Sequence, residues 1–418
     1  MQRIAIIGGG IAGLTAAYLL QQRYQVSLYE KSARVGGNAY THTTSDGVSA
    51  DVGVMSFERK AYRNFFRLME HLGIESVSGA GRMGGAFINL QTAEACYISP
   101  HLRGLIAQRF GLFRPSRLFD NLRLPLGMHE AKRLARRGDC NGLTLEQGLQ
   151  RLPKITGDGK LAFISTLCMM SSMHCEELLA SPAKFFFGKL EKYGSLFPPQ
   201  ILWRIRFMKQ GTRSYVEKLS NSLRERIEFN ARIHSVERDE QGVVLNMQDG
   251  ERRRYDKVVF ACHADQALRL LARPSALEQN LLGVWRYTDN EIVVHRDLSP
   301  FPQKALLDGY SFLYTRGGRY IDTSVTFSLW ILPTAPRSSD WMITQHQNFP
   351  IRQEAIDARF SFKTPIFDFP AVAVQTELPR LNGQLHSYYC GSHFGFGLHE
   401  DAVSSAIRVA DQLGVSFS

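Results

Sequence analysis

Short apolar runs and helical patterns alternate at the beginning of the chain. Residues 3–7 form a β-rich apolar run, and an Ala- and Leu-rich helical pattern follows over residues 14–20. A second strand pattern occupies residues 25–29. Across residues 61–72, apolar positions recur at the spacing of an amphipathic helix, and Gly73 follows as a cap. Strands that alternate with helices predict an α/β fold built on a parallel sheet.

The middle of the chain has a different pattern. Residues 140–200 look helical with few helix breakers, which predicts a helical substrate domain with an apolar interior. Three alternating apolar segments, Arg232–Glu237, Gly242–Met247 and Tyr255–Ala261, then predict a β-meander. The Met and Phe residues of the helical region form either core or a pocket wall; they are Met169, Met170, Met173, Phe185, Phe186 and Phe187.

A glycine turn connects the first strand pattern to the first helical one. Gly8 permits the tight turn, Gly10 lets a pyrophosphate approach the backbone, and Gly13 allows close packing of helix on strand. Glu30 ends the second strand pattern, where an acid can accept hydrogen bonds from both hydroxyls of a ribose and disfavours a 2'-phosphate. We therefore predict dinucleotide contacts at Gly8, Gly10, Ile11, Ala12, Gly13 and Glu30.

The composition is that of a globular protein. Hydrophobic residues make up 44% and charged residues 21% of 418 residues, a length that suggests two or three domains. No apolar run approaches the ~18 residues that cross a bilayer, so we expect neither a spanning helix nor a secretory signal. The six cysteines form no CxxC pair and are too sparse for a disulfide scaffold. We expect a reduced, cytoplasmic compartment and no metal site.

The formal net charge of +11 favours an anionic partner. Residues 101–137 hold nine Lys or Arg against two acids, and the cations alternate with Leu, Ile and Phe. Interfacial segments combine apolar insertion and attraction to anionic headgroups in this way, so peripheral contact with the inner face of an anionic membrane is one interpretation. A solvated face on amphipathic helices is the other. A shorter basic stretch spans residues 204–213. Nucleic acid is not expected, because the chain has no RNA-recognition signature or basic zipper.

The stretch Glu30–Asn38 resembles the second signature of the flavin amine oxidase superfamily. This resemblance implies non-covalent FAD in place of NAD, with further cofactor contacts at Lys31, Arg34, Gly36, Gly37 and Asn38. Asn38 stands where many relatives have Arg. Two later stretches are similar to landmarks of the superfamily: Asp51–Gly53 is one, and Gly211–Tyr215 resembles the return from the substrate domain to the FAD domain.

The carboxyl-terminal block Tyr388–Asp401, followed by a helical pattern, resembles the superfamily's final strand, cofactor loop and helix. Such a helix would direct its amino terminus at the flavin N1 and C2 carbonyl, where negative charge develops on reduction. Ser392 replaces the acid usual there, and Cys390 aligns with a buried strand residue, not with a linking thiol. The resemblance implies cofactor contacts at Ile233, Ala261, Gly391, Ser392, Leu398, His399 and Glu400.

The resemblance, to a bacterial branch of flavin amine oxidase-like proteins, covers roughly half of the chain, and some members resemble enzymes acting near modified fatty-acid synthesis. It implies a Rossmann-like FAD-binding domain of the glutathione reductase or amine oxidase type, interleaved with an α+β substrate domain. We assign residues 1–60, 205–265 and 380–418 to the FAD-binding domain and residues 61–204 and 266–379 to the substrate domain. Departures from the branch, such as Thr-Pro in place of His-Pro at residues 364–365, prevent transfer of a substrate.

These features predict an FAD-dependent oxidoreductase that passes a hydride from an amine or an apolar, lipid-like substrate to flavin N5. Candidate bases are His263, His393 and His399, although a structural role is favoured for each of them. Cys262 and His263 form either a reactive pair or a simple strand-to-helix junction.

Two other classes of function stay open. One is a flavin-free or flavin-inactive lipid-binding escort of the same fold, for which residues 101–137 would be the functional surface. Glu30 and the Gly391 block speak against it. The other is a redox-neutral flavin mutase or isomerase, which would need a sugar-nucleotide anchor. The electron acceptor and the oligomeric state are not predicted by the sequence.

Overall fold

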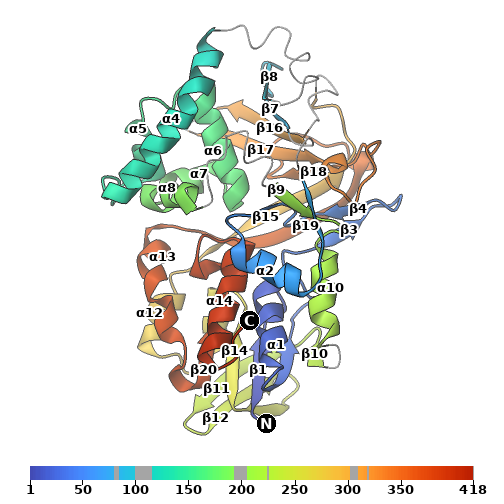
Figure 1. The fold of residues 1–418 in the computed structure, drawn as a ribbon, viewed down its shortest axis with the longest axis vertical. Helices are drawn as coiled ribbons and strands as arrows, with labels where there is room; N and C mark the ends of the chain where they lie inside the picture. Colours follow the sequence, from blue (N-terminus) through green and yellow to red (C-terminus); the bar gives the residue numbers. More distant parts are fainter. Residues whose placement is uncertain are drawn as a thin grey trace.

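The computed structural model describes residues 1–79, 84–98, 115–192, 205–223, 226–301, 309–317 and 320–417. The chain forms two parts stacked along the long axis of the molecule (Figure 1). A parallel sheet with its helices makes the lower part, where both termini lie, and a larger sheet with a helical layer makes the upper part. The fold is therefore a mixed α/β architecture of the predicted class.

The lower part is built on a five-stranded, all-parallel sheet in the order β10-β2-β1-β14-β20. Its strands are β1 (Arg3–Ile7), β2 (Gln25–Tyr29), β10 (Ile227–Glu228), β14 (Lys257–Phe260) and β20 (Ser387–Tyr389). The helices α1 (Ile11–Leu20), α10 (Arg213–Asn221) and α14 (His399–Gln412) cover one face. Because successive strand residues point to opposite faces, Ile4 and Ile6 pack against these helices and Ala5 and Ile7 pack toward the other face.

A three-stranded antiparallel meander covers that other face. It consists of β11 (Ile233–Asp239), β12 (Gly242–Met247) and β13 (Arg252–Tyr255), so the prediction that Tyr255–Ala261 is its third strand was wrong. At Asp256 the chain leaves the meander and enters the parallel sheet. The Asp256 carboxylate accepts the Arg3 N–H at 2.6 Å. The apolar run that follows is β14, which pairs with β1, because a strand buried on both faces favours continuous apolar residues over alternation.

The upper part is a seven-stranded mixed sheet in the order β19-β15-β18-β17-β16-β7-β8. Neighbouring strands are antiparallel except β16 and β7, which run parallel. The strands are β7 (Gly84–Asn89), β8 (Ala95–Ile98), β15 (Tyr287–His295), β16 (Gly309–Arg316), β17 (Ile321–Ser328), β18 (Met342–Gln345) and β19 (Ile356–Pro365).

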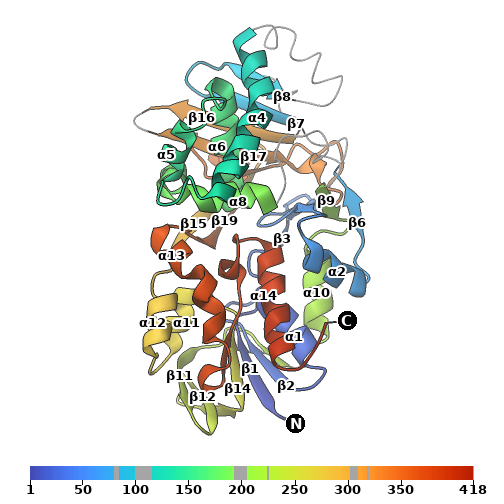
Figure 2. The same cartoon turned by 60° about the vertical axis from the view of Figure 1, so that its left-hand side comes forward.

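A helical layer lies on one face of this sheet, which we call the inner face (Figure 2). Its helices are α4 (Pro115–Arg137), α5 (Leu145–Gln150), α6 (Gly157–Ser171), α7 (Cys175–Ala180) and α8 (Ala183–Lys192). Thr323 of β17 donates to Ser165 of α6 at 3.3 Å, which joins the layer to the sheet. In the predicted Met and Phe cluster, Met173 and the three Phe residues are buried in the main core, so they are core residues.

Smaller elements connect the two parts or pack on the lower one. They are β3 (Thr41–Thr43), β4 (Ser49–Asp51), β5 (Phe57–Glu58), α2 (Arg63–His71), β6 (Ser76–Ser78), β9 (Ile205–Met208), α11 (Ala264–Leu270), α12 (Ala276–Leu282) and α13 (Phe369–Val374). Phe65 and Leu68 of α2 pack in the core that holds α1 and α14. This helix therefore packs with the parallel-sheet part, although residues 61–204 are predicted to belong to the substrate domain. The other predicted boundaries stay predictions.

The predicted basic segment is described only in part. Residues 101–114 lie outside the described residues, as do Trp203 and Arg204 of the shorter stretch. Residues 115–137 form α4, which stands at the far end of the upper part (Figure 1). Within the described ranges, no helix is both long and apolar enough to span a membrane.

Candidate cofactor and active site

The glycine turn lies between the carboxyl end of β1 and the amino end of α1. A Cβ at Gly13 would lie 1.9 Å from the carbonyl oxygen of Gly8, and Gly8 itself has a φ of +109° against Ala261. These two glycines are therefore required by packing. A Cβ at Gly10 would meet no atom within 4 Å, and no side chain caps α1. The amino terminus of α1, with Ile11 and Ala12, thus faces open space, as an anion-binding helix terminus does.

Glu30 borders the same turn. Its Oε2 accepts the backbone N–H of Gly9 at 2.7 Å, and its Oε1 accepts the N–H and hydroxyl of Ser32 at 2.8 and 2.6 Å. The N–H of Ala231 donates to the Glu30 carbonyl at 2.9 Å, which brings the start of β11 and Ile233 beside the acid. The position predicted for the ribose thus adjoins the segment predicted for the adenine.

A second glycine loop lies against the first. Gly36 donates its N–H to the Gly9 carbonyl at 2.8 Å, and a Cβ at Gly37 would lie 3.2 Å from the Cα of Gly10. Arg34 donates to the Gly37 carbonyl at 3.1 Å and stacks 4.1 Å from the ring of Tyr40. Burial lowers the pKa of this guanidinium. Lys31 is exposed, and Asn38 approaches the Lys363 carbonyl of β19 at 3.5 Å.

The carboxyl-terminal block closes the other side of this region. β20 ends beside β14, and Gly391, Ser392 and Leu398 form the loop before α14. A Cβ at Gly391 would lie 2.7 Å from the His393 ring, so only glycine fits there. Asp401 accepts the N–H groups of Phe396 and Leu398 at 2.9 and 3.1 Å, which fixes the loop on the first turn of α14.

These elements converge at the carboxyl ends of the parallel strands β1, β14 and β20, which is where ligands bind in open α/β sheets. The open space at Gly10 and the uncapped helix above it fit a pyrophosphate, and the acid beside them fits a ribose. The residues present therefore fit a dinucleotide.

Residues 11–342 match the family of flavin-containing amine oxidoreductases. The chain belongs to this family. Its cofactor is FAD, and its class is that of the FAD-dependent oxidoreductases. The predicted resemblance to the flavin amine oxidase superfamily is confirmed.

Known relatives of this oxidoreductase include several enzymes. Zeta-carotene desaturase from Capsicum annuum is 38% identical over 74 residues, which are 18% of this chain and 12% of the relative, so the match spans about an eighth of that protein. Putrescine oxidase bound to putrescine shares the fold with a TM-score of 0.72 at 13% identity, covering 99% of this chain and 98% of that one. A fatty acid isomerase from P. acnes shares it with a TM-score of 0.68 at 15% identity, covering 100% and 99%.

The three histidines predicted as candidate bases are all packed against aromatic rings. His263 stacks on Tyr287 with ring centroids 4.2 Å apart, and burial lowers its pKa to about 4. His393 lies against Trp285, and burial lowers its pKa to about 3. His399 bonds the Tyr215 hydroxyl at 3.2 Å, and burial lowers its pKa to about 4. All three are uncharged at neutral pH.

Other predicted contacts have local structural partners. The Glu400 carboxylate accepts the N–H groups of Asn64 and Phe65 at 3.1 and 2.9 Å, so its side chain holds the start of α2. Burial raises the pKa of both Cys262 and Cys390 to about 12. Such thiols stay protonated, which disfavours the reactive pair at residues 262–263. The described residues contain no group of three potential ligands that could hold a metal ion.

Two predicted landmarks meet in the structure. Asp51 Oδ1 accepts the hydroxyls of Thr41 and Thr212 at 2.6 and 3.0 Å and the N–H of Thr212 at 3.0 Å. Burial raises the pKa of Asp51. These hydrogen bonds join the hairpin of β3 and β4 to the start of α10. They therefore fix the point at which the chain returns from the upper part to the parallel-sheet part.

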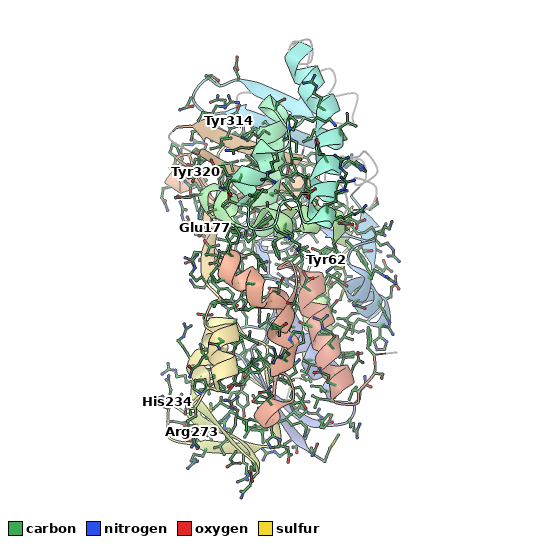
Figure 3. All side chains as sticks on the ribbon, turned by 90° about the vertical axis from the view of Figure 1, so that its left-hand side faces the viewer. Tyr62, Glu177, His234, Arg273, Tyr314 and Tyr320 are labelled. Atoms are coloured by element: carbon green, nitrogen blue, oxygen red, sulfur yellow. The ribbon has the colours of Figure 1, made fainter. Side chains whose placement is uncertain are left out.

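The substrate side of the site was not found from the sequence. The upper sheet presents an apolar inner face that includes Ile292, Phe327 and Phe362, and Tyr40 of the lower part packs against it. Asn290 lies two residues before Ile292 on β15, so its side chain is on the same inner face. Asn290 is buried, and its Oδ1 has no hydrogen-bond partner. Figure 3 shows Tyr62 and Glu177 at the level where the two parts meet.

Proposed function

We propose that this enzyme removes a hydride from an amine or an apolar, lipid-like substrate and delivers it to the N5 atom of non-covalently bound FAD. The observation that carries the proposal is the convergence of the open α1 terminus, Glu30 and the loop before α14 at one edge of the parallel sheet. The upper sheet comes close to that edge through its edge strand β19, whose Lys363 carbonyl lies 3.5 Å from the Asn38 amide nitrogen.

The bound cofactor supplies the hydride acceptor, and the chain supplies position and environment. Uncapped N–H groups of α1 would bind the pyrophosphate, and Glu30 would orient the ribose. The amino terminus of α14 would favour negative charge on the reduced flavin. Apolar residues of the inner face hold the substrate and exclude water, which preserves a near-attack geometry.

The candidate bases constrain the form of the substrate. His263, His393 and His399 are uncharged at neutral pH and have pKa values lowered to between about 3 and 4 by burial. A base with such a pKa is poorly matched to taking a proton from an ammonium group near pH 7. An amine substrate must therefore bind in its neutral form. Desaturation of an apolar chain releases a hydride from one carbon and a proton from the neighbouring carbon, and an uncharged imidazole can accept that proton.

An anaerobic screen tests the proposal. Purified enzyme holding FAD is mixed with pools of lipids and amines without oxygen, and loss of the oxidised flavin absorption is followed. We expect at least one pool to bleach the flavin. A colourless protein that cannot take up FAD would favour the lipid-binding escort, and tightly bound FAD that no pool reduces would favour the mutase or isomerase.

We also propose peripheral contact with an anionic membrane from the cytoplasmic side. The support is α4, on which Leu126 is 56% exposed and Arg123, Arg133, Arg136 and Arg137 are exposed as well. Vesicle flotation tests it. Binding to anionic vesicles that weakens when these arginines are changed to glutamine supports the contact, and equal flotation with neutral lipid would contradict it.

A further inference from the structure

A lysine is buried in the helical layer above the cofactor loop. Lys189 of α8 has 0% exposure. Its Nζ donates to the Met170 carbonyl at 3.3 Å and to the Ser171 hydroxyl at 3.2 Å, both at the carboxyl end of α6. An ammonium group has three N–H donors, so two long hydrogen bonds leave one donor unused.

No counter-charge accompanies this lysine. Among the residues that the structure describes, no carboxylate lies within ion-pair distance of Lys189. Asp401 is the acid whose charge acts on it, but its carboxylate is paired with Lys192 at 3.0 Å. Burial lowers the pKa of Lys189 to about 8, with Asp401 opposing the shift. The side chain is therefore a buried cation at neutral pH, and such cations are normally paired.

The end of α6 beside Lys189 meets the strands β18 and β19, and we call this place the junction. Ser172 follows the end of α6 with a φ of +50°, and it is held by Gln345 and Thr364, which approach from β18 and β19. The ring of His346 lies 4.4 Å from that of His174 and beside the Ser172 backbone, and neither His346 nitrogen forms a hydrogen bond of normal geometry. His346 is a non-glycine residue with a φ of +53°, and its buried ring lacks satisfied hydrogen bonds. Such a strained and unsatisfied residue indicates a functional constraint and not simple packing.

The junction lies beside the cofactor loop and the apolar inner face. Phe185, one turn before Lys189, stacks on Phe367 at 4.5 Å and contacts Phe396 of the loop at 4.9 Å. Met169 packs against the apolar inner face. A molecule at this place would thus meet apolar side chains along its body and a cation at its end.

A capping role explains the position only in part. Lysines often bond the last carbonyls of a helix, which stabilises the helix only weakly. Burying an unpaired charge costs considerably more free energy than such a cap provides. The cap is too weak to offset that cost, which leaves an anion as the missing partner.

We infer that Lys189 binds the carboxylate of an apolar, acyl-chain substrate. The inference rests on the proposed function and names its substrate class. The acyl chain lies along the inner face, and His346 supplies a further hydrogen bond to the polar end. Lys189 determines specificity here and takes no part in the redox step.

Isothermal titration of the FAD-loaded enzyme tests this with decanoate, decanol and decylamine. We expect decanoate to bind about tenfold or more tighter than decanol. The variant Lys189→Gln should lose that preference, whereas Lys189→Arg should keep it. Lys184→Gln, which changes an exposed lysine of the same helix, is the matched control and should also keep it.

Equal binding of decanoate and decanol, a preference for decylamine, or a Lys189→Gln enzyme that still selects decanoate would each overturn the inference. If Lys189→Gln does not fold, the affinities of the three ligands for the unmodified enzyme and for Lys189→Arg still test the inference. Because binding is measured without turnover, failure of this site is distinguishable from failure of hydride transfer, which the anaerobic screen reports.

Discussion

Glu30 accepts the backbone N–H of Gly9 at 2.7 Å, which joins the acid at the end of β2 to the glycine turn after β1. The two residues are separated by 21 positions, and the parallel pairing of β1 with β2 brings them together. The same carboxylate therefore fixes the turn beside which we predict the ribose.

Replacement of this acid should weaken cofactor binding. Glu30→Ala removes the ribose acceptor and leaves the Gly9 N–H unpaired, so we expect FAD affinity to fall about tenfold or more, since a hydrogen bond to a charged group is worth about 1.5–3 kcal/mol. Fluorescence titration of the apoprotein with FAD measures this. The exposed Glu75→Ala is the control and should bind FAD normally. Unchanged affinity in Glu30→Ala would mean that the ribose lies elsewhere.

Two glycines of the turn should respond differently to alanine. Gly10→Ala places its methyl group in open space at a φ of −69°, so the fold should survive while FAD affinity drops. Gly13→Ala forces a Cβ to within 1.9 Å of the Gly8 carbonyl, so the apoprotein itself should lose stability. Thermal unfolding without FAD and FAD titration separate the two effects. The account fails if Gly10→Ala unfolds the apoprotein or leaves FAD binding intact.

Local motifs made the cofactor side predictable. The glycine turn, Glu30 and the loop at Gly391 each have a fixed relation to a strand end, and the order of parallel strands brings strand ends together. The meander was misjudged because Tyr255 is the last residue of β13, whereas β14 (Lys257–Phe260) belongs to the parallel sheet. The hydrogen bonds between Asp256 and Arg3, which separate the two strands, join residues far apart in the chain.

The substrate side depends on contacts that no local pattern shows. Lys189 follows Phe185 by four residues, which places it on the same face of α8, and this spacing was the one available signal. Its burial depends on α6, and the unpaired groups of Asn290 and His346 depend on the pairing of the upper sheet.

The ion pair between Arg238 and Glu278 should be a strong determinant of stability. Their side chains are 2% and 5% exposed, and Glu278 also accepts the Tyr389 hydroxyl. Arg238→Met leaves a buried carboxylate unpaired, so we expect a loss of about 3–5 kcal/mol in urea unfolding. The exposed pair of Arg359 and Glu291 is the comparison, and Arg359→Met should cost under about 1 kcal/mol. Equal losses would show that burial does not set the cost.

Lys189 should make stability depend on alkaline pH. Its pKa of about 8 in the folded chain lies below the unfolded value of 10.5, so the unfolded state binds more protons between these values. Burial of the charged lysine lowers the free energy of unfolding by about 3 kcal/mol at pH values below 8. This destabilisation disappears as the pH rises from 8 toward 10.5, so the protein becomes more stable across that range.

Urea unfolding of the ligand-free protein and Lys189→Met across this range measures that cost. The variant should be the more stable protein at pH 7, and its advantage should shrink toward pH 10. Lys189→Arg, which keeps its charge throughout, should show no such convergence. A constant difference between Lys189→Met and the unmodified chain would contradict the buried-cation assignment.

The central claim is that the α1 terminus, Glu30 and the α14 loop bind one flavin dinucleotide. The most direct measurement is mass spectrometry of the ligand that acid releases from the purified protein, together with FAD titration of the stripped chain. The account predicts released FAD and saturation at one FAD per chain. Release of a different nucleotide, or no uptake of FAD in excess, would contradict it.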